Sequence, residues 1–596
     1  MSTKRSKIDR IFTGLVLVSL TLFCSLVSAQ TQTPSPAATK DQTSGGSDTE
    51  TQKDFKYVLE IGGQYRDVNG ERPSKFEEYK SVRNGFLFRR GSFEYNPEGS
   101  PTFLNFAARN VSERDQQYYI EGGQFGRFRL KGTWDSQPHL YARGVASLLG
   151  GAGPGIYTVA DSVQADLQAL DPPMAGTTVP NPALIAATKS YVNSATRFDL
   201  RSQRQTLSVD GRYNVTSNFY VGFRVFDTKR FGQRPLGTGT YERIGTSIGD
   251  TFRVHSVELP AEIDQRTTNF AFVAGYLTKD WGVNFEYTYS NFSNDINSYV
   301  YDNPFRLTDQ ATTGTGGAFN RMAFARGLHG AMPDNEAQGI MITGFVNLPL
   351  DSRWAGAFGW QRWSQNDPFV PYTLNTQTGA PLNVTDPANL PEDSLNGEIE
   401  NITVDQLFTT RPWSNLTFNA RYKAYREHNN TEPILFPGYA AFLEAWWRPS
   451  IQGSYSLPGQ PKPIENEPAS YTRQRAGGEV IWEIFSNLRW KGEFEWERWD
   501  RTHRQADQTN EQKYITSVMW KPFKKLKTDL DYRYQVRTPD AYIVGPLENQ
   551  QLRMFDQAKR IRHDVKSNGS GQLRRRSASR AISCTSPTIT TRTSTG

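Results

Sequence analysis

The chain has 596 residues, of which 37% are hydrophobic, 13% aromatic and 22% charged. Its net charge of +7 comes from its two ends: residues 1–29 carry +3 and residues 565–596 carry +6, which leaves the body at −2. This distribution argues against nucleic-acid binding. The only cysteines are Cys24 and Cys584, so a disulfide framework and a cysteine metal site are excluded. The chain also has no C-x-x-C-H motif, so it carries no covalently attached haem of its own.

The N-terminus has the three parts of a secretory signal. Four basic residues precede an apolar run at 11–27, and small residues offer a cleavage site after Ala29. The alternative, a membrane anchor helix, would need a longer apolar run. Thr, Ser, Pro and Gln dominate the next segment. We therefore expect a signal peptide at 1–29, a disordered linker at 30–52 and a folded body at 53–564.

From residue 55 onward, apolar and polar residues alternate with a period of two, which is typical of β-strands that have two different faces. Runs of about ten residues or more meet across short turns that contain Pro, Asn, Asp or Ser. The predicted hairpins join 204–214 with 219–229, 267–277 with 281–291, 339–348 with 353–363, 398–409 with 415–426, 472–484 with 488–499, and 511–520 with 525–537. Long polar excursions separate them, at 230–265, 292–337, 365–397 and 427–471.

Short turns that alternate with long loops, together with long strands and aromatic residues near the strand ends, are typical of outer-membrane β-barrels. The alternative is a soluble sandwich or propeller, whose strands average about five or six residues. A mean hydropathy of −0.62 does not oppose the barrel, because averages hide alternation. The predicted fold class is all-β: a large antiparallel transmembrane β-barrel of the bacterial outer membrane.

Two regions disturb this pattern. The hairpins give about sixteen strands, but 135–203 breaks their parity, and 182–195 has helical spacing after Pro182. After residue 564 the alternation ends, and residues 565–596 form a basic tail. An incomplete barrel would leave strand edges unpaired in lipid. We therefore interpret the tail as the product of a frameshifted or truncated gene and expect a C-terminally incomplete barrel, a hypothesis that the downstream reading frames test.

The stretch 525–537, KLKTDLDYRYQVR, is half charged. Its apolar residues, such as Leu530, are expected to face lipid, whereas the charged residues between them must face water or a partner. The stretch 488–497 repeats this pattern. The residues predicted to face the lumen are Arg489, Lys491, Glu493, Glu495, Lys527, Asp529, Asp531 and Arg533.

Other motifs are weaker signals. Residues 245–249 match the nucleophile-elbow pattern G-x-S-x-G, but no helix follows them, so a flexible loop is favoured over a hydrolase site. The six histidines are scattered singly and predict no metal site. Acid–amide pairs at 302–303, 334–335 and 366–367 lie in or beside long loops, where oxygen ligands can bind calcium. Turn formation is the favoured explanation for these pairs.

Several stretches together resemble the MtrB/PioB family of outer-membrane barrels associated with decahaem cytochromes. In chain order they cover most of 55–564. The stretches are GGQFGRFRLKGTWDSQPH (122–139), FRVFDTKRFGQRPLG (223–237), VELPAEIDQRT (257–267), YTYSNFSNDINSYVYDNPF (287–305), PDNEAQG (333–339), QNDPFVPYTLN (365–375), the Arg411-Pro412 turn before ARYKAYREHNN (420–430), and LRMFDQAKRIRHD (552–564).

The resemblance implies a barrel that sheathes a periplasmic multihaem c-type cytochrome, so that electrons cross the outer membrane along the partner's haems. It also implies a dock for an outer-surface cytochrome. No catalytic residue carries over, and the Cys-x-x-Cys found near the mature N-terminus of some relatives is missing. We expect a non-enzymatic barrel without a cofactor of its own. The alternatives are a general diffusion porin for small solutes and, from a different class, an outer-membrane hydrolase.

Overall fold

The computed structural model describes the backbone of most of the chain after residue 54. The described residues are 55–65, 75–111, 113–171, 181–244, 251–309, 324–374, 383, 385–436, 464–523, 526–543, 554–575, 578–585 and 589–593. The predicted signal peptide and linker lie outside these residues, as does the G-x-S-x-G stretch at 245–249. None of the described helices is long and apolar enough to cross a membrane.

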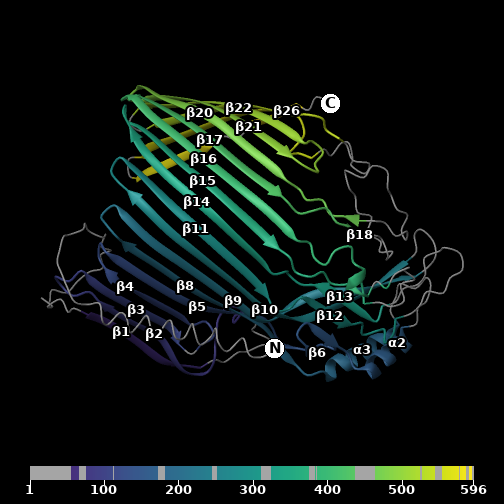
Figure 1. Ribbon diagram of the computed structural model, residues 1–596. Coiled ribbons are helices and arrows are strands. Elements are labelled where there is room, and N and C mark those ends of the chain that lie inside the picture. The colour runs from purple at the N-terminus through teal and green to yellow at the C-terminus, as the bar shows by residue number, and fades with distance from the viewer. Residues whose placement is uncertain are drawn as a thin grey trace.

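A single antiparallel sheet dominates the structure and curves along its width (Figure 1). Its 20 described strands form a meander in which each strand from β1 to β24 pairs with the next one of the sheet, and β24 pairs with both β25 and β26. The strands are β1 (Phe55–Gln64), β2 (Gly85–Tyr95), β3 (Thr102–Val111), β4 (Gln117–Gln124), β5 (Phe128–Val145), β8 (Phe198–Asn214), β9 (Phe219–Ile244), β10 (Thr251–Leu277), β11 (Trp281–Asn294), β14 (Asn335–Leu348), β15 (Ser352–Gln365), β16 (Gly397–Trp413), β17 (Leu416–Asn429), β20 (Tyr471–Phe485), β21 (Leu488–Arg501), β22 (Gln508–Phe523), β23 (Leu526–Pro539), β24 (Arg560–Arg575), β25 (Ala578–Thr585) and β26 (Ile589–Thr593).

The two ends of the sheet differ in their connections. The turns between β8 and β9 and between β20 and β21 lie at one end, which we call the turn end. The long connections lie at the opposite end, the excursion end. The parity problem at 135–203 disappears because β5 pairs directly with β8, and the residues between them form one excursion.

The excursions hold a small folded unit at the excursion end (Figure 1). A four-stranded sheet combines β6 (Gly150–Gly153) and β7 (Ile156–Thr158) with β12 (Ser298–Asp302) and β13 (Arg326–Gly330). β7 and β12 pair in parallel although about 140 residues separate them. The helices α2 (Asp161–Leu170) and α3 (Pro182–Ser194) belong to the same unit. Short elements elsewhere are β18 (Leu435–Phe436), β19 (Ile464–Glu465) and the 3-10 helix η1 (Pro387–Asn389).

The helix expected after Pro182 is present as α3. The side chain of Asn181 accepts a hydrogen bond from the backbone N–H of Ala183, and Pro182 occupies the first turn, where a missing N–H costs nothing. Leu184 is the buried residue of this helix. Local start signals therefore suffice to predict α3, although they do not show what it packs against.

The prediction of a long excursion at 230–265 is wrong, because most of these residues form strands. β9 and β10 pair without a register shift from Phe219 opposite Tyr276 to Ile244 opposite Thr251. The sequence hides this hairpin because Pro235 and Pro260, which lie opposite each other, are poor strand residues. Packing outweighs that propensity: Leu259 is fully buried in a cluster that includes core residues of the small sheet.

The sheet continues beyond residue 564, where the alternation ends. β24 extends to Arg575, and β25 and β26 pair along its far edge. Ladder hydrogen bonds come from the backbone, so pairing does not require alternating side chains. The boundary expected at 564 is therefore not the end of the sheet. No pairing between β1 and β25 or β26 occurs among the described residues, so the barrel is not closed.

Gly155 is a position where the small sheet depends on glycine. It has a φ of +72°, and an added Cβ would meet the backbone carbonyl of Ser298 in β12. We expect Gly155→Ala to destabilise the small unit by roughly 1–3 kcal/mol. Hydrogen exchange of the β7 and β12 amides measures this loss. Gly151→Ala is the matched control, because a Cβ there has no neighbour within 4 Å; equal exchange in both variants would contradict the prediction.

Candidate functional site

One face of the main sheet is apolar and exposed. Phe93, Phe106 and Ile120 lie directly opposite one another in β2, β3 and β4, and each is more than a third exposed. Phe494 and Tyr514 continue the pattern in β21 and β22, with ring centroids 5.2 Å apart. Such a wide apolar surface is unfavourable in water and suits contact with lipid. We call it the apolar face.

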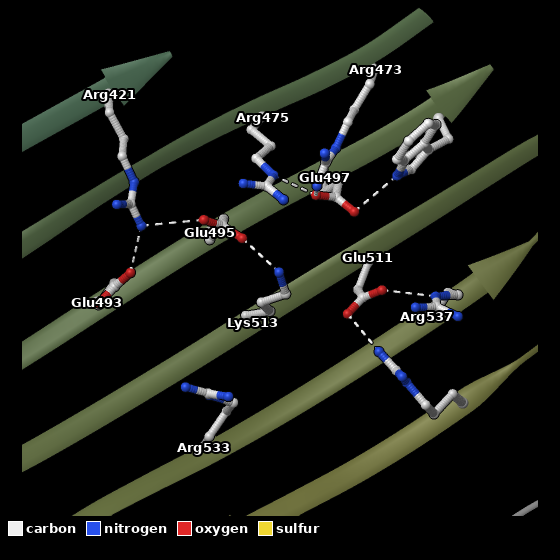
Figure 2. A network of polar contacts seen from close by, with 12 residues as sticks. Arg421, Arg473, Arg475, Glu493, Glu495, Glu497, Glu511, Lys513, Arg533 and Arg537 are labelled. Atoms are coloured by element: carbon white, nitrogen blue, oxygen red, sulfur yellow. Dashed lines mark hydrogen bonds and ion pairs between the residues drawn. The ribbon is translucent and has the colours of Figure 1, made fainter. Parts of the chain in front are cut away.

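The opposite face, the charged face, carries a network of ion pairs across β17 and β20–β24 (Figure 2). Residues directly opposite each other in an antiparallel ladder share a face, so register decides which charges meet. One cross-strand row contains Gly477, Glu495, Lys513 and Gln535. A neighbouring row contains Arg475, Glu497, Glu511 and Arg537.

Glu495 lies between two cations from different strands. Arg421 donates to it from β17 at 3.2 Å and also to Glu493 at 2.6 Å, while Lys513 of β22 donates at 2.6 Å. Arg421 reaches across β20 at Gly477, which lies directly between Arg421 and Glu495 in the register. A Cβ at Gly477 would lie 2.7 Å from the carbonyl oxygen of Phe494, so glycine keeps this crossing open.

Glu497 is held even more closely. Arg473 and Arg475 both donate to its Oε2, at 2.8 and 2.5 Å, and the indole N–H of Trp499 donates to its Oε1 at 2.9 Å. The residue is 8% exposed. A buried carboxylate is tolerated when cations and hydrogen bonds satisfy it, so this part of the charged face is pre-organised.

Glu511 bridges the last strands of the network. Its two oxygens accept from Arg537 of β23 at 2.7 Å and from Arg560 of β24 at 3.0 Å. Glu511 is 4% exposed. Because each arginine comes from a different strand, this carboxylate ties β22, β23 and β24 together on the charged face (Figure 2).

An aromatic cluster lies on the same face toward the excursion end. Tyr471 stacks obliquely between Tyr425 and Trp499, with ring centroids 5.6 Å apart on each side. The guanidinium groups of Arg473 and Arg501 each lie 4.7 Å from the Trp499 ring. The network therefore ends in a surface that combines cations with π-systems.

The eight residues predicted to face the lumen lie on β21 and β23. Lys491 bridges Glu479 and Glu493 at 2.9 Å each, and Arg489 pairs with Glu483. In β23, Lys527 pairs with Asp529 at 3.1 Å, and Arg533 lies 3.9 Å from Asp564 of β24. Asp531 lies opposite Ser517 and Lys566. Whether their face borders a lumen stays a prediction.

Sequence reasoning missed most cations that complete the network. Arg421, Lys513 and Arg560 lie on β17, β22 and β24, outside the two stretches 488–497 and 525–537 that gave the predicted lumen residues. The alternation in 420–428 and 508–520 is a signal that could have found the first two. No such signal assigns Arg560 to Glu511, because their sequence separation is 49 residues and only the register brings them together.

The acid–amide pairs of the loops serve as local caps. Asp334 Oδ1 accepts from the backbone N–H of Asn294 at 2.6 Å, and Asp367 Oδ2 accepts from that of Asp334 at 2.6 Å. Burial raises the pKa of Asp334, and the nearby carboxylates of Asp367 and Asp295 add to this shift. Across the part of the chain that the structure describes, no group of three or more His, Cys, Asp or Glu side chains could hold a metal ion.

A wide antiparallel meander with an exposed apolar face, a charged opposite face, and short turns at one end defines an outer-membrane β-barrel protein. Residues 67–572 match the family described as "Putative outer membrane beta-barrel porin, MtrB/PioB". This match covers most of the chain, so the chain belongs to the MtrB/PioB family of the bacterial outer membrane. No curated protein matches the chain.

The chain is also similar to several solved structures. They include the copper transporter OprC (8% identity, TM-score 0.34), the ferric-catecholate import receptor Fiu from E. coli K12 (12%, 0.31) and the siderophore receptor PiuA from Acinetobacter baumannii (10%, 0.32). The matches cover 82%, 81% and 86% of this chain, and 65%, 66% and 73% of those chains. The chain thus spans slightly less than two thirds of OprC and Fiu. At these TM-scores the likeness carries no argument about function.

Proposed function

We propose that this barrel sheathes a periplasmic multihaem c-type cytochrome and so supports electron transfer across the outer membrane. The observation that carries the proposal is the charged face, where buried carboxylates such as Glu497 and Glu511 are already held by paired arginines. A hydrophilic protein surface can dock against such a wall without leaving a charge unpaired. Membership of the MtrB/PioB family and the earlier resemblance support the same assignment.

The chemistry of the chain decides which roles belong to the barrel and which to its partner. It has no haem-attachment motif, so the haems and the redox chemistry belong to the partner. The barrel separates the haems from lipid through its apolar face and supplies a polar wall inside. On this proposal the protein is not an enzyme and contributes no catalytic residue. The long connections at the excursion end are available to an outer-surface cytochrome.

A general diffusion porin is the second candidate. The family description contains the word porin, and a wall with interspersed charges of both signs also suits a water-filled channel for small solutes. In that case the side chains of the charged face would meet water and solutes rather than a protein. The two candidates therefore differ in what occupies the lumen.

Co-purification distinguishes them. A tagged chain purified from its native membrane should carry haem absorbance in a fixed ratio to the barrel. Liposomes that contain the complex and enclose a redox dye should reduce the dye when a membrane-impermeant reductant is added outside. Purification without haem, combined with solute conductance of the barrel alone, would contradict the sheath and support the porin.

A single substitution on the charged face tests the proposed contact with the cytochrome. Lys423 is half-exposed on the charged face and pairs with Asp405, also partly exposed, at 2.5 Å, so its loss costs the barrel little. We expect Lys423→Glu to lower the haem-to-barrel ratio after washes at moderate salt, because reversing a charge disturbs the electrostatic match between the charged face and a docked partner. Lys279→Glu, in the exposed turn between β10 and β11, is the matched control. Equal haem retention in both variants would argue against a partner that contacts the charged face.

A further inference from the structure

A cationic pocket of about 310 Å³ lies at the excursion end of the N-terminal strands. Residues 77 and 80–83 between β1 and β2, residues 113–114 between β3 and β4, and the ends of β5 and β8 form its walls. Its five cationic side chains are Lys80, Arg83, Arg114, Arg143 and Arg201. Only two carboxylates, Glu77 and Glu113, share the lining, so positive charge dominates.

The carboxylates near the pocket are already engaged. Arg83 Nε donates to Glu113 at 2.5 Å, and Arg143 donates to Glu77. A third carboxylate, Asp199, accepts from Arg201 at 2.8 Å. The lining has more cations than carboxylates, so these ion pairs do not neutralise the positive charge of the pocket.

Two cationic side chains remain for a ligand. The structure shows no ion pair for the side chains of Lys80 and Arg114 within the described ranges, and both residues are exposed. No carboxylate of the pocket lining forms an ion pair with either side chain, so both can bind an anionic group.

The pocket opens on the side of the apolar face. Gly132 lies opposite Ile120 of that face, and the ladder between β5 and β8 runs without a shift from Phe128 to Leu140. Leu140, which lines the pocket opposite Arg201, therefore shares the face of Gly132 and Trp134.

The height of the pocket places it outside the hydrocarbon. Trp134 forms a tilted aromatic pair with Tyr118, as expected for an interfacial residue. Leu140 is six residues further along β5, which is roughly 20 Å of strand or about 14 Å of height at a tilt of ~45°. This level lies beyond the hydrocarbon on the side of the long loops, which in outer-membrane barrels is the side of the outer leaflet.

The geometry points to a binding site for a phosphate monoester, supplied by the headgroup of a lipopolysaccharide in the outer leaflet. Arginine forks match phosphate oxygens, and Arg114 and Lys80 provide the charge that the pocket's own carboxylates leave uncompensated. The lipid is preferred to free phosphate because the pocket continues the lipid-facing wall. The site is separate from the charged face and does not depend on what fills the lumen.

Binding of lipid A to the purified full chain tests the site. Native mass spectrometry in a neutral detergent, with a chelator to remove bridging divalent cations, should detect a complex with bisphosphorylated lipid A. The double variant Lys80→Glu/Arg114→Glu should bind about tenfold more weakly or worse, because two cations become repulsive. Lys189→Glu, at an exposed position of α3 outside the pocket, should bind like the wild type.

Two further arms identify the source of the phosphate. Dephosphorylated lipid A should not bind at the pocket, and millimolar inorganic phosphate should not displace the lipid. Equal binding of lipid A by the wild type and the double variant would overturn the site. Displacement by inorganic phosphate would overturn the lipid assignment. Circular dichroism and heat-modifiable migration verify that each variant is folded, and Lys80→Gln/Arg114→Gln replaces the double variant if it is not.

Discussion

Leu530→Arg should impair assembly of the barrel by roughly 2–4 kcal/mol if the residue sits near the middle of the bilayer. Leu530 lies on the apolar face of β23, where it is 51% exposed and opposite Val518. In lipid an arginine here must bury a charge or distort the bilayer to reach water. The fraction of folded, heat-modifiable barrel after refolding into vesicles, followed by urea titration, measures the effect.

The neighbouring residue provides the control. Asp531 lies on the charged face, so Asp531→Asn keeps the shape and removes a charge from the polar wall. We expect a change within about 0.5 kcal/mol. Comparable losses of barrel stability in the two variants would contradict the assignment of the two faces. That assignment places residue 530 against lipid and residue 531 on the charged face.

Glu511→Gln should destabilise the barrel by roughly 3 kcal/mol, because it leaves Arg537 and Arg560 facing each other without their shared carboxylate. Glu511 is nearly fully buried, and the side chains of the two arginines are only 13% and 23% exposed, so water screens their repulsion poorly. The midpoint of urea unfolding in detergent or lipid should fall accordingly. The slope of the transition should stay unchanged if the folded barrel is the same.

An exposed ion pair on a neighbouring strand calibrates this result. Glu483 pairs with Arg489, and both side chains are about half exposed. Glu483→Gln should cost about 1 kcal/mol or less, as exposed ion pairs do. If Glu483→Gln and Glu511→Gln shift the urea midpoint equally, burial of the network does not matter for stability and the charged face is freely hydrated.

The paired strands of short hairpins could be predicted from local pattern alone. Residues 267–277 and 281–291 alternate on both sides of Thr278-Lys279-Asp280, and the structure pairs them across that turn. Chain connectivity makes such neighbours adjacent, so pattern and turn chemistry are enough. The alternation of β21 and β23 likewise separates the apolar residues from the charged ones without any knowledge of their neighbours.

Partners across the sheet could not be predicted in this way. The set of Arg421, Glu495 and Lys513 depends on the register of three strand pairs and on Gly477 leaving a gap. The pairing of β7 with β12 depends on two excursions meeting in space, and the pairing of Pro235 with Pro260 contradicts local propensity. These contacts are non-local, so their energies do not appear in any short window of sequence.

Local sequence thus decides which residues of KLKTDLDYRYQVR share a face, because side chains of a strand alternate whatever its neighbours are. Only the tertiary structure decides that Arg537 in this stretch meets Glu511, and that Arg560 from a strand beyond a long connection completes the contact. The physical reason is range: alternation is a property of the backbone of one strand, whereas a satisfied buried charge requires donors that register brings from several strands.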